Sequence, residues 1–525
     1  MAGSLLLGID IGTSSAKGVL CSADGAILAT ATIEHETNFP RAGWAEHEAD
    51  GLWWAEIVAI ARQLISGKYT GRDLGAVAVS AIGPCMVPLD RNGKPLRPAI
   101  LYGIDTRASA EIELLNDELG ADAIFSLSGM ALTSQSIGPK ILWLKRHEPE
   151  LFALTAMIHS SSDYVVFRLT GEHVVDRHTA SYFAPLFNIE TLEWDARFAG
   201  AVIDPDRLPR LGDATELAGG VSAAASRETG IPVGTPVTFG TIDAAAEAVS
   251  VGVHRAGDTM LMYGSTMFML GTVEHPQPDP RLWTTAHPLP GRMAVTGGMA
   301  TSGLLTTWFR DLTMDRRSVG GLDGNLKTLI AEATATAPGA DGLICLPYFA
   351  GERSPIQDPE ARGVFAGLTL RHGRGHLFRA VLEGIGFGAR HNLDAMREMR
   401  APPDRLVAVG GGTKNPLWLQ VVSDIAGVGQ HIPERTVGAA LGDAFMAGIG
   451  SGLIPNFESL DRDWVRIVDR IEPNLALAVN YDELYEVYID VDQQTRESMH
   501  RLGRTAAIQT SRLRSNEGGR PRSTL

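Results

Sequence analysis

A hydroxyl-rich loop follows the first apolar run of the chain and carries residue types that bind phosphate. The stretch "LLLGIDIGTSSAKGVL" (residues 5–20) places glycine, hydroxyls and a lysine between two apolar segments. Glycine lets the backbone approach an anion closely, and successive N–H groups form an anion-binding nest. The residues of this predicted phosphate loop are Gly12, Thr13, Ser14, Ser15 and Lys17. A polar hairpin in which Asp10 accepts hydrogen bonds from turn amides explains the same residues equally well.

A second turn of this kind lies in the other half of the chain. Residues 257–272 read "GDTMLMYGSTMFMLGT", so apolar segments flank Gly264, Ser265 and Thr266. Two such turns facing each other across a cleft could hold one polyphosphate from both sides. Taken alone, a Gly-Ser-Thr turn is also what an ordinary hairpin contains.

Two aspartates end apolar strands where they could act on a phosphate group. Asp243 follows "PVTFGTI" and opens an alanine-rich helix. It could cap that helix, or act as a general base that takes a proton from an alcohol attacking a γ-phosphate. Asp10 ends the first apolar strand, where its carboxylate could hold Mg²⁺ directly or through water, with Asp243 as a second metal-associated carboxylate.

The segment "VAVGGGTKNP" (residues 407–416) joins a strand to a helix through three glycines. Gly410, Gly411 and Gly412 would let a flat ring or a ribose lie against bare backbone, and Asn415 could hydrogen-bond to it. A flexible strand-to-helix turn is an equally good interpretation. The sequence contains neither G-x-x-x-x-G-K-[ST] nor G-x-S-x-G, and no His/Cys spacing typical of a structural metal site.

The elements that would position these residues follow an α/β pattern. Strands are expected at residues 5–10, 16–22, 23–36, 74–83, 157–171, 235–243, 257–272, 341–349 and 405–412. Helices are expected at residues 49–66, 244–252, 374–396, 439–452 and 482–502. Because the pattern restarts near residue 236, and 525 residues exceed what one core supports, more than one domain is predicted. The segment from 504 to 525, rich in Arg, Ser and Gly, is expected to be a flexible tail.

Composition narrows the class of protein. With 44% apolar residues, 20% charged residues and a net charge of −15, the chain is an ordinary globular protein without a nucleic-acid-binding face. The three cysteines are widely separated, which indicates reduced thiols. The sequence shows no basic leader and no apolar span of about 18 residues. A cytoplasmic protein with no membrane partner is therefore expected.

In this order, the motifs resemble the FGGY family of carbohydrate kinases. The most specific match is "GVFAGLTLRHGRGHLFRAVLEG" (residues 363–384), which resembles the family's C-terminal signature along its length. "DIGTSSAK", "GTIDAAAEAVSVG", "LPYFAGERSP" and "VGGGTKNPLWLQVVSDIAG" fall at the expected intervals, so the resemblance covers about residues 5–455. Within the family, "RPAIL", "PKILWLKRHEPELF" and "GWAEHEADGLWW" look most like xylulokinases and related ketose kinases.

The resemblance implies a two-domain α/β fold of the ribonuclease-H-like, actin-like ATPase class with a central cleft. Residues 1–253 would bind the sugar, residues 254–485 would bind the nucleotide, and residues 486–525 would form a terminal helix and a basic tail. ATP and Mg²⁺ are the implied cofactors, with Asp243 as the catalytic base and Asp10 beside the metal. Gly303 and the glycines at 410–412 would lie along the nucleotide. Related kinases are often dimers, so a homodimer is also expected.

The chain departs from the family pattern where the sugar should bind. Xylulokinases carry Gln-Met-His where this chain has Ile82, Gly83 and Pro84, glycerol kinases carry an Arg-Glu pair there, and Ala244 stands where these families place Asn or Gln. A site built for particular hydroxyls discriminates strongly, so a different sugar or polyol contact is expected. The candidate substrate contacts are Gly83, Pro84, Asp105, Arg107 and Gln135, together with the base Asp243.

Three functions fit these observations. The first is an ATP-dependent kinase that phosphorylates a ketose, such as xylulose or ribulose, or a sugar alcohol. The second is a catalytically decayed sugar or nucleotide sensor on the same scaffold, and the third is an actin-fold ATPase that acts on protein partners. Because Asp10 and Asp243 are both present, and a sensor needs no base, the kinase is favoured.

Overall fold

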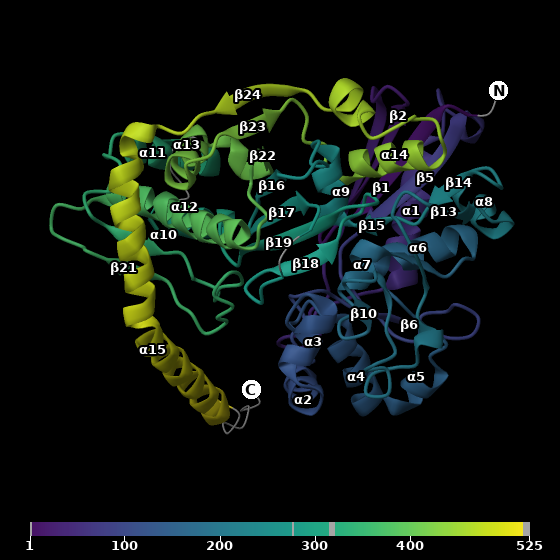
Figure 1. The fold of residues 1–525 in the computed structure, drawn as a ribbon, viewed down its shortest axis with the longest axis horizontal. Helices are drawn as coiled ribbons and strands as arrows, with labels where there is room; N and C mark the ends of the chain where they lie inside the picture. The colour runs from purple at the N-terminus through teal and green to yellow at the C-terminus, as the bar shows by residue number, and fades with distance from the viewer. Residues whose placement is uncertain (1–2, 276–277, 314–320, 518–525) are drawn as a thin grey trace, which may run out of the picture.

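Two seven-stranded sheets form the core of the molecule. The computed structural model describes residues 3–275, 278–313 and 321–517. In Figure 1 the first sheet lies among the purple and blue elements and the second among the teal and green ones. Short two-stranded ladders complete the strand set: β4 (Glu46–His47) with β7 (Ala99–Ile100), β6 (Val87–Leu89) with β8 (Met157–His159), β9 (Val174–Asp176) with β12 (Arg210–Gly212), β10 (Phe187–Asn188) with β11 (Glu193–Trp194), and β20 (Ile344–Leu346) with β21 (Val364–Ala366).

The first sheet positions the amino-terminal motif. Its strands run in the order β13 (Leu217–Gly220), β14 (Pro236–Thr238), β5 (Leu74–Ala81), β1 (Leu5–Ile11), β2 (Ser15–Ser22) and β3 (Ile27–Glu34), with β15 (Thr241–Ile242) also paired to β5. β1 pairs antiparallel with β2 and parallel with β5. Almost every residue of β1 is buried, as expected for a central strand that is covered on both faces.

The second sheet repeats this local topology. Its order is β18 (Trp283–Ala286), β19 (Met293–Met299), β17 (Met267–Val273), β16 (Asp258–Tyr263), β22 (Arg405–Val409), β23 (Gln430–Pro433) and β24 (Ile467–Ile471). β16 pairs antiparallel with β17 and parallel with β22, as β1 does with β2 and β5. The two hairpins with glycine–hydroxyl turns therefore occupy corresponding places in the two sheets.

Helices cover both sheets and fill the space around them. In the first half of the chain they are the π-helix η1 (Ala49–Trp54), α1 (Ala55–Leu64), α2 (Ser109–Leu119), α3 (Ala121–Ser128), α4 (Ile137–His147), α5 (Pro149–Leu154), α6 (Ser161–Thr170), α7 (Arg177–Ser181), α8 (Ala223–Thr229) and α9 (Asp243–Ser250). In the second half they are α10 (Gly303–Thr313), α11 (Gly321–Thr334), α12 (Arg374–Glu398), α13 (Pro416–Ala426), α14 (Ala439–Gly450) and α15 (Ala478–Glu517). Within the described residues, no helix is both long enough and apolar enough to cross a membrane.

One late helix returns to the first sheet. α14 packs against β1, β5 and α9, and Figure 1 shows it beside the purple strands. The approach requires glycine, because a Cβ added at Gly8 would lie 1.9 Å from the carbonyl oxygen of Ala440. A Cβ at Gly442 would similarly lie 2.0 Å from the carbonyl oxygen of Ala246. The alanine-rich face of α9 thus permits a close helix contact.

Two predictions of secondary structure were wrong. Residues 157–171 form the short β8 and then the helix α6, not one long strand. The polar group in the middle of the run starts this helix, because the Ser160 backbone N–H donates to Asp163 at 2.9 Å in a capping box. Helix α15 extends to Glu517, in place of the loose tail expected from residue 504; residues 518–525 lie outside the described residues.

Candidate active site

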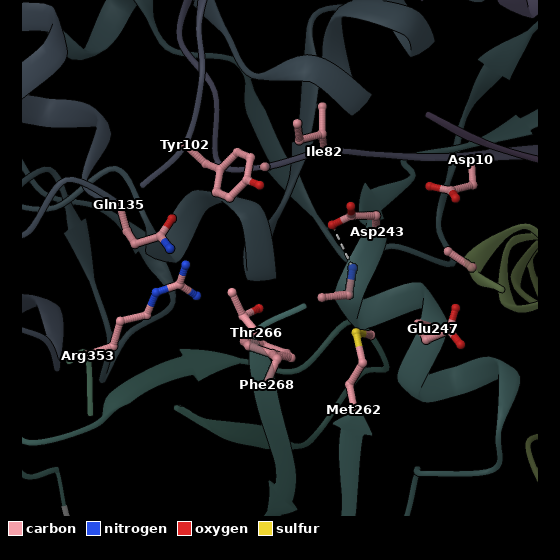
Figure 2. A pocket seen from close by; sticks show the side chains of 13 residues that line it. Asp10, Ile82, Tyr102, Gln135, Asp243, Glu247, Met262, Thr266, Phe268 and Arg353 are labelled. Carbon is pink, nitrogen blue, oxygen red and sulfur yellow. Dashed lines mark hydrogen bonds between the residues drawn. The ribbon is translucent and has the colours of Figure 1, made fainter. Parts of the chain in front are cut away.

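A cavity of about 240 Å³ receives side chains from both sheets. Figure 2 shows Asp10, Asp243 and Glu247 on one side of this space, and Gln135 and Arg353 on another. The apolar part of its wall is made by Ile82, Ala244, Met262 and Phe268. We call this space the acceptor cavity, because it contains the carboxylate that was predicted to act as a base.

Strand ends bring the acidic residues together. β1 and β5 run parallel, with Asp10 opposite Ser80, and β15 continues beside the same end of β5 with Thr241 opposite Ser80. Asp243 follows β15 directly. The carboxyl ends of neighbouring strands therefore place Asp10 and Asp243 at one edge of the first sheet, as is usual for sites in α/β sheets.

Asp243 is the first residue of α9 rather than its N-cap, which is Ile242. The Ala244 backbone N–H donates to Asp243 Oδ1 at 2.8 Å, so one carboxylate oxygen is held by the first turn of the helix. Burial raises the pKa of Asp243 to about 6, and the Ala244 hydrogen bond opposes this rise. A carboxylate with a pKa in this range is a stronger base than an exposed aspartate.

A buried network supports Asp10. Burial, followed by the charges of Asp243 and Glu247, raises the pKa of Asp10 well above its ordinary value. Ser80 Oγ lies 3.3 Å from Asp10 Oδ1 and 2.7 Å from Asp443 Oδ2, which comes from α14. The residue at 443 thus links the late helix to the edge of the first sheet.

Glu247 lies one helical turn after Asp243 and lines the same cavity. Its pKa is raised to about 7 by burial, opposed by Lys17 and reinforced by Asp243. Lys17 itself stands opposite Asp10 in the β1–β2 ladder. The site therefore holds several carboxylates that repel one another, with one lysine to offset them.

This charge pattern fits a divalent cation. Mg²⁺ binds through one or two carboxylates and keeps several waters, and in the described residues no three His, Cys, Asp or Glu side chains converge to form a complete metal site. Asp10 and Asp243 are the two carboxylates that would face such an ion. Burial raises the pKa of both carboxyl groups, and for Asp10 the charges of Asp243 and Glu247 raise it further, so a bound cation would favour their ionised forms.

The predicted phosphate loop lies beside this cavity rather than in its wall. Gly12 to Lys17 are not found among the described residues that line the acceptor cavity, nor among those that line a second cavity in the later half of the chain. The Gly12 N–H donates to the Ser15 carbonyl at 2.9 Å, so one amide of the proposed nest is used within the hairpin. Thr13 Oγ1 lies 3.2 Å from the hydroxyl of Tyr102, which does line the acceptor cavity.

A second cavity, of about 440 Å³, gathers most of the glycines predicted to bind a nucleotide. Its wall includes the predicted residues Gly264, Ser265, Gly303, Gly411, Gly412 and Asn415. It also includes Lys414, Trp418 and, from α11, the apolar Leu326 and Ile330. We call this space the nucleotide cavity.

Two of the residues predicted to bind the nucleotide, Gly410 and Thr266, are not in the described wall of this cavity. Gly410 has a φ of +93° and supports the turn, since an added Cβ would lie 2.7 Å from the Tyr263 carbonyl oxygen; it is not part of the described wall. Asn415 lines the cavity and also caps α13 by accepting a hydrogen bond from the Trp418 N–H at 3.2 Å. Thr266 lines the acceptor cavity instead of the nucleotide cavity.

The same hairpin therefore borders both cavities. Gly264 and Ser265 line the nucleotide cavity, and the next residue, Thr266, lines the acceptor cavity. The start of α10 holds the hairpin in place, because the N–H groups of Gly303 and Leu304 donate to the carbonyls of Gly264 and Ser265. A group transferred between the two cavities would pass this turn.

The predicted substrate contacts separate into two groups. Gly83 and Gln135 line the acceptor cavity, whereas Pro84, Asp105 and Arg107 are not in its described wall. Asp105 and Arg107 form a fully buried ion pair at 2.7 Å, and the Asp105 carboxylate also accepts the Ala45 N–H at 2.7 Å. The polar groups of Asp105 and Arg107 are thus hydrogen-bonded within the protein interior. This pair has a structural role and lies outside the described wall of the cavity.

The residues missed in the sequence include Tyr102, Glu247 and Arg353 in the acceptor cavity and Asp443 in the network behind it. Two of them had a usable signal. Glu247 is spaced four residues from Asp243 on one helix face, and Asp443 is the lone charge in "AALGDAFMAGIG". Arg353 lies within a motif that resembles the family pattern, but the position of this motif in the sequence did not indicate that its arginine lines the cavity.

Comparison with known proteins covers nearly the whole chain. Models of the FGGY family of carbohydrate kinases match residues 5–250 (N-terminal domain) and 259–451 (C-terminal domain). A xylulose kinase of Lactococcus lactis is 30% identical over 508 residues, covering 95% of this chain and 98% of that protein. A gluconokinase of Bacillus subtilis is 28% identical over 500 residues, covering 93% and 96%. The crystal structure of a xylulose kinase from Rhodospirillum rubrum has a TM-score of 0.88 and 32% identity, covering 94% of this chain and 100% of that one.

Proposed function

This chain belongs to the FGGY family of carbohydrate kinases, and on that premise we propose that it transfers the γ-phosphate of ATP to a hydroxyl of a ketose or a sugar alcohol. It is a sugar kinase, a phosphotransferase with an alcohol as acceptor. The similar xylulose kinase and gluconokinase cover this chain to nearly the same extent, so overall similarity does not identify the acceptor. The side chains of the acceptor cavity must determine it.

The observation that carries the proposal is the hairpin shared by the two cavities. ATP in the nucleotide cavity would place its base between the apolar side chains of α11 and the bare backbone at Gly411 and Gly412. Its phosphates would run toward Gly264 and Ser265, and Lys414 offers a cation in the same wall. The γ-phosphate would then reach Thr266, at the boundary with the cavity that contains Asp243.

Asp243 would act as the general base. Its carboxylate takes the proton of the acceptor hydroxyl as that oxygen attacks the γ-phosphorus, the bond to the bridging oxygen breaks, and ADP leaves. Asp10 and Asp243 would hold Mg²⁺, which supplies neutralisation of charge on the phosphate oxygens when it is bound. The apolar wall formed by Met262 and Phe268 would limit the access of water, which would otherwise compete as acceptor.

The test is ADP release with Mg-ATP in a coupled assay against pentuloses, hexuloses, pentitols, tetritols and glycerol. One compound with turnover far above the acceptor-free background would support the proposal. If ATP binds and no compound in the panel is phosphorylated, the kinase assignment for these acceptors fails, and a binding protein on the same scaffold becomes the better account.

A further inference from the structure

Two hydrogen-bond donors face the same part of the acceptor cavity. Figure 2 shows the amide nitrogen of Gln135 and the guanidinium of Arg353 turned toward one another. Gln135 Oε1 accepts the Gly103 N–H at 3.2 Å, which fixes the amide with its NH₂ group toward the cavity. An arginine side chain donates and never accepts, so neither group can satisfy the other.

A rigid loop presents Arg353. The Glu352 carboxylate accepts the N–H groups of Ala300 and Arg353, each at 2.7 Å. The next residue, Ser354, receives the Gly298 N–H at 2.6 Å and donates to Asn392 at 2.6 Å. This buried anchoring to β19 and α12 holds the backbone on both sides of Arg353.

Within the described part of the chain, the Arg353 guanidinium has no acidic partner of its own. Among the described residues, no ion pair within 4.0 Å involves Arg353, although the carboxylates of the site lie across the same cavity. One end of the cavity thus presents donors, and the other end, with Asp10, Asp243 and Glu247, presents acceptors. A molecule that fits both ends carries a hydroxyl for Asp243 and, away from it, an oxygen that only accepts.

We propose that Arg353 and Gln135 bind the carbonyl oxygen of a ketose, and so make this kinase select ketoses over the corresponding sugar alcohols. The proposal rests on the proposed function and deepens it. A carbonyl oxygen has two lone pairs and no proton, so it can accept from both donors at once. A sugar alcohol places a hydroxyl there, whose proton would face the NH₂ group and the guanidinium, while Gln135 Oε1 already accepts the Gly103 N–H. The acceptor site is then made by both halves of the chain, with Arg353 supplied by the second half.

The experiment compares matched acceptors in wild type and in Arg353→Gln, which removes the charge and the planar fork. Acceptors are ketopentoses, the pentitols with the same carbon skeleton, and the related pentonates and gluconate. The wild type should favour a ketose, and Arg353→Gln should lower kcat/KM for that ketose by about 10- to 100-fold. The pentitol should change by less than about threefold, so the ketose-to-pentitol ratio collapses. Arg371→Gln, at an exposed arginine, is the control for loss of charge and should match wild type.

Binding of a non-hydrolysable ATP analogue, measured by calorimetry, tests whether each variant keeps its nucleotide cavity. An equal loss with ketose and pentitol would show a merely structural Arg353 and overturn the proposal. A wild-type preference for a pentitol, or for an aldonate, whose carboxylate would satisfy the same donors, would also overturn it while leaving the kinase intact. Absence of turnover with every acceptor would instead reject the proposed function.

Discussion

Asp243 illustrates how one side chain can serve both local structure and chemistry. Its Oδ1 accepts the N–H of Ala244 in the first turn of α9, while the carboxylate also borders the acceptor cavity. Burial raises its pKa to about 6. An aspartate at a water-exposed helix start would instead remain a weak base, because nothing would disfavour its charged form.

Replacing Asp243 with Asn should separate catalysis from binding. The amide keeps the size of the side chain and cannot take a proton, so kcat should fall by about 10²- to 10⁴-fold while nucleotide affinity stays within about threefold. Steady-state ADP release and calorimetric titration measure the two quantities. Asp117→Asn, at an exposed position on α2, is the matched control and should leave both unchanged. Near-normal kcat in Asp243→Asn would rule out the base assignment.

The pH dependence should report the same carboxyl group. A base acts only when ionised, so kcat/KM should be on its plateau well above pH 6 and fall tenfold per pH unit below about pH 6. Initial rates across this range measure the limb. Glu247→Gln should keep the limb near pH 6, because Glu247 is not the base. A limb that stays below pH 5 would mean that Asp243 keeps the pKa of an exposed aspartate.

At the level of helices and strands, the site depends on close packing among α9, α14 and β1. Asp243 and Glu247 come from α9, Asp10 from β1, and Asp443 from α14. Gly8 and Gly442 permit this approach, since a side chain at either position would enter the backbone of its neighbour. Small residues thus set the distances among the four carboxyl groups.

Gly442→Ala should therefore destabilise the protein and impair the site together. The new Cβ would lie 2.0 Å from the Ala246 carbonyl oxygen, so α9 and α14 must move apart. Overpacking of this kind costs about 1–3 kcal/mol, which should lower Tm by about 1–3 °C in a protein of this size. Thermal unfolding and kcat measure both effects. Gly200→Ala is the control, because its Cβ would meet open space; an unchanged Tm in Gly442→Ala would refute the packing account.

For the molecule as a whole, the acceptor cavity is complete only when both halves contribute. Asp243, Tyr102 and Gln135 come from the first half, and Thr266, Phe268 and Arg353 come from the second. A substrate that touches both sides gains binding energy when the halves draw together, as in other kinases in which closure excludes water.

Solution scattering should detect this movement. The radius of gyration should decrease most when a non-hydrolysable ATP analogue with Mg²⁺ and the acceptor are present together, because only then are both cavities filled. The analogue alone and the acceptor alone are the comparisons, and each should give a smaller change. Identical scattering curves in all three conditions would contradict ligand-driven closure.

Local patterns in the sequence were sufficient for the elements that carry their own signal. The hairpins around Gly12 and Gly264, the helix that begins at Asp243, and α12 and α14 are present close to where apolar periodicity and turn residues placed them. Residues 157–171 were misread, because an apolar run does not distinguish a strand from a buried helix until its capping residues are considered. Gly411 and Gly412 line one cavity, as their lack of side chains suggested, and Gly303, which was expected there from the family resemblance, lines the same cavity.

Contacts between distant segments could not be obtained in this way. Asp443 reaches Asp10 through Ser80, which precedes Asp443 by 363 residues in the chain. Arg353 enters a cavity lined mostly by the first half of the chain and the second hairpin. Asp105 and Arg107 had the right chemistry for a sugar, but folding paired them with each other in the interior. Backbone propensity and hydrophobic pattern act over a few residues and can be read along the chain. Which polar groups face a cavity, and which neutralise one another, depends on how whole sheets and helices pack.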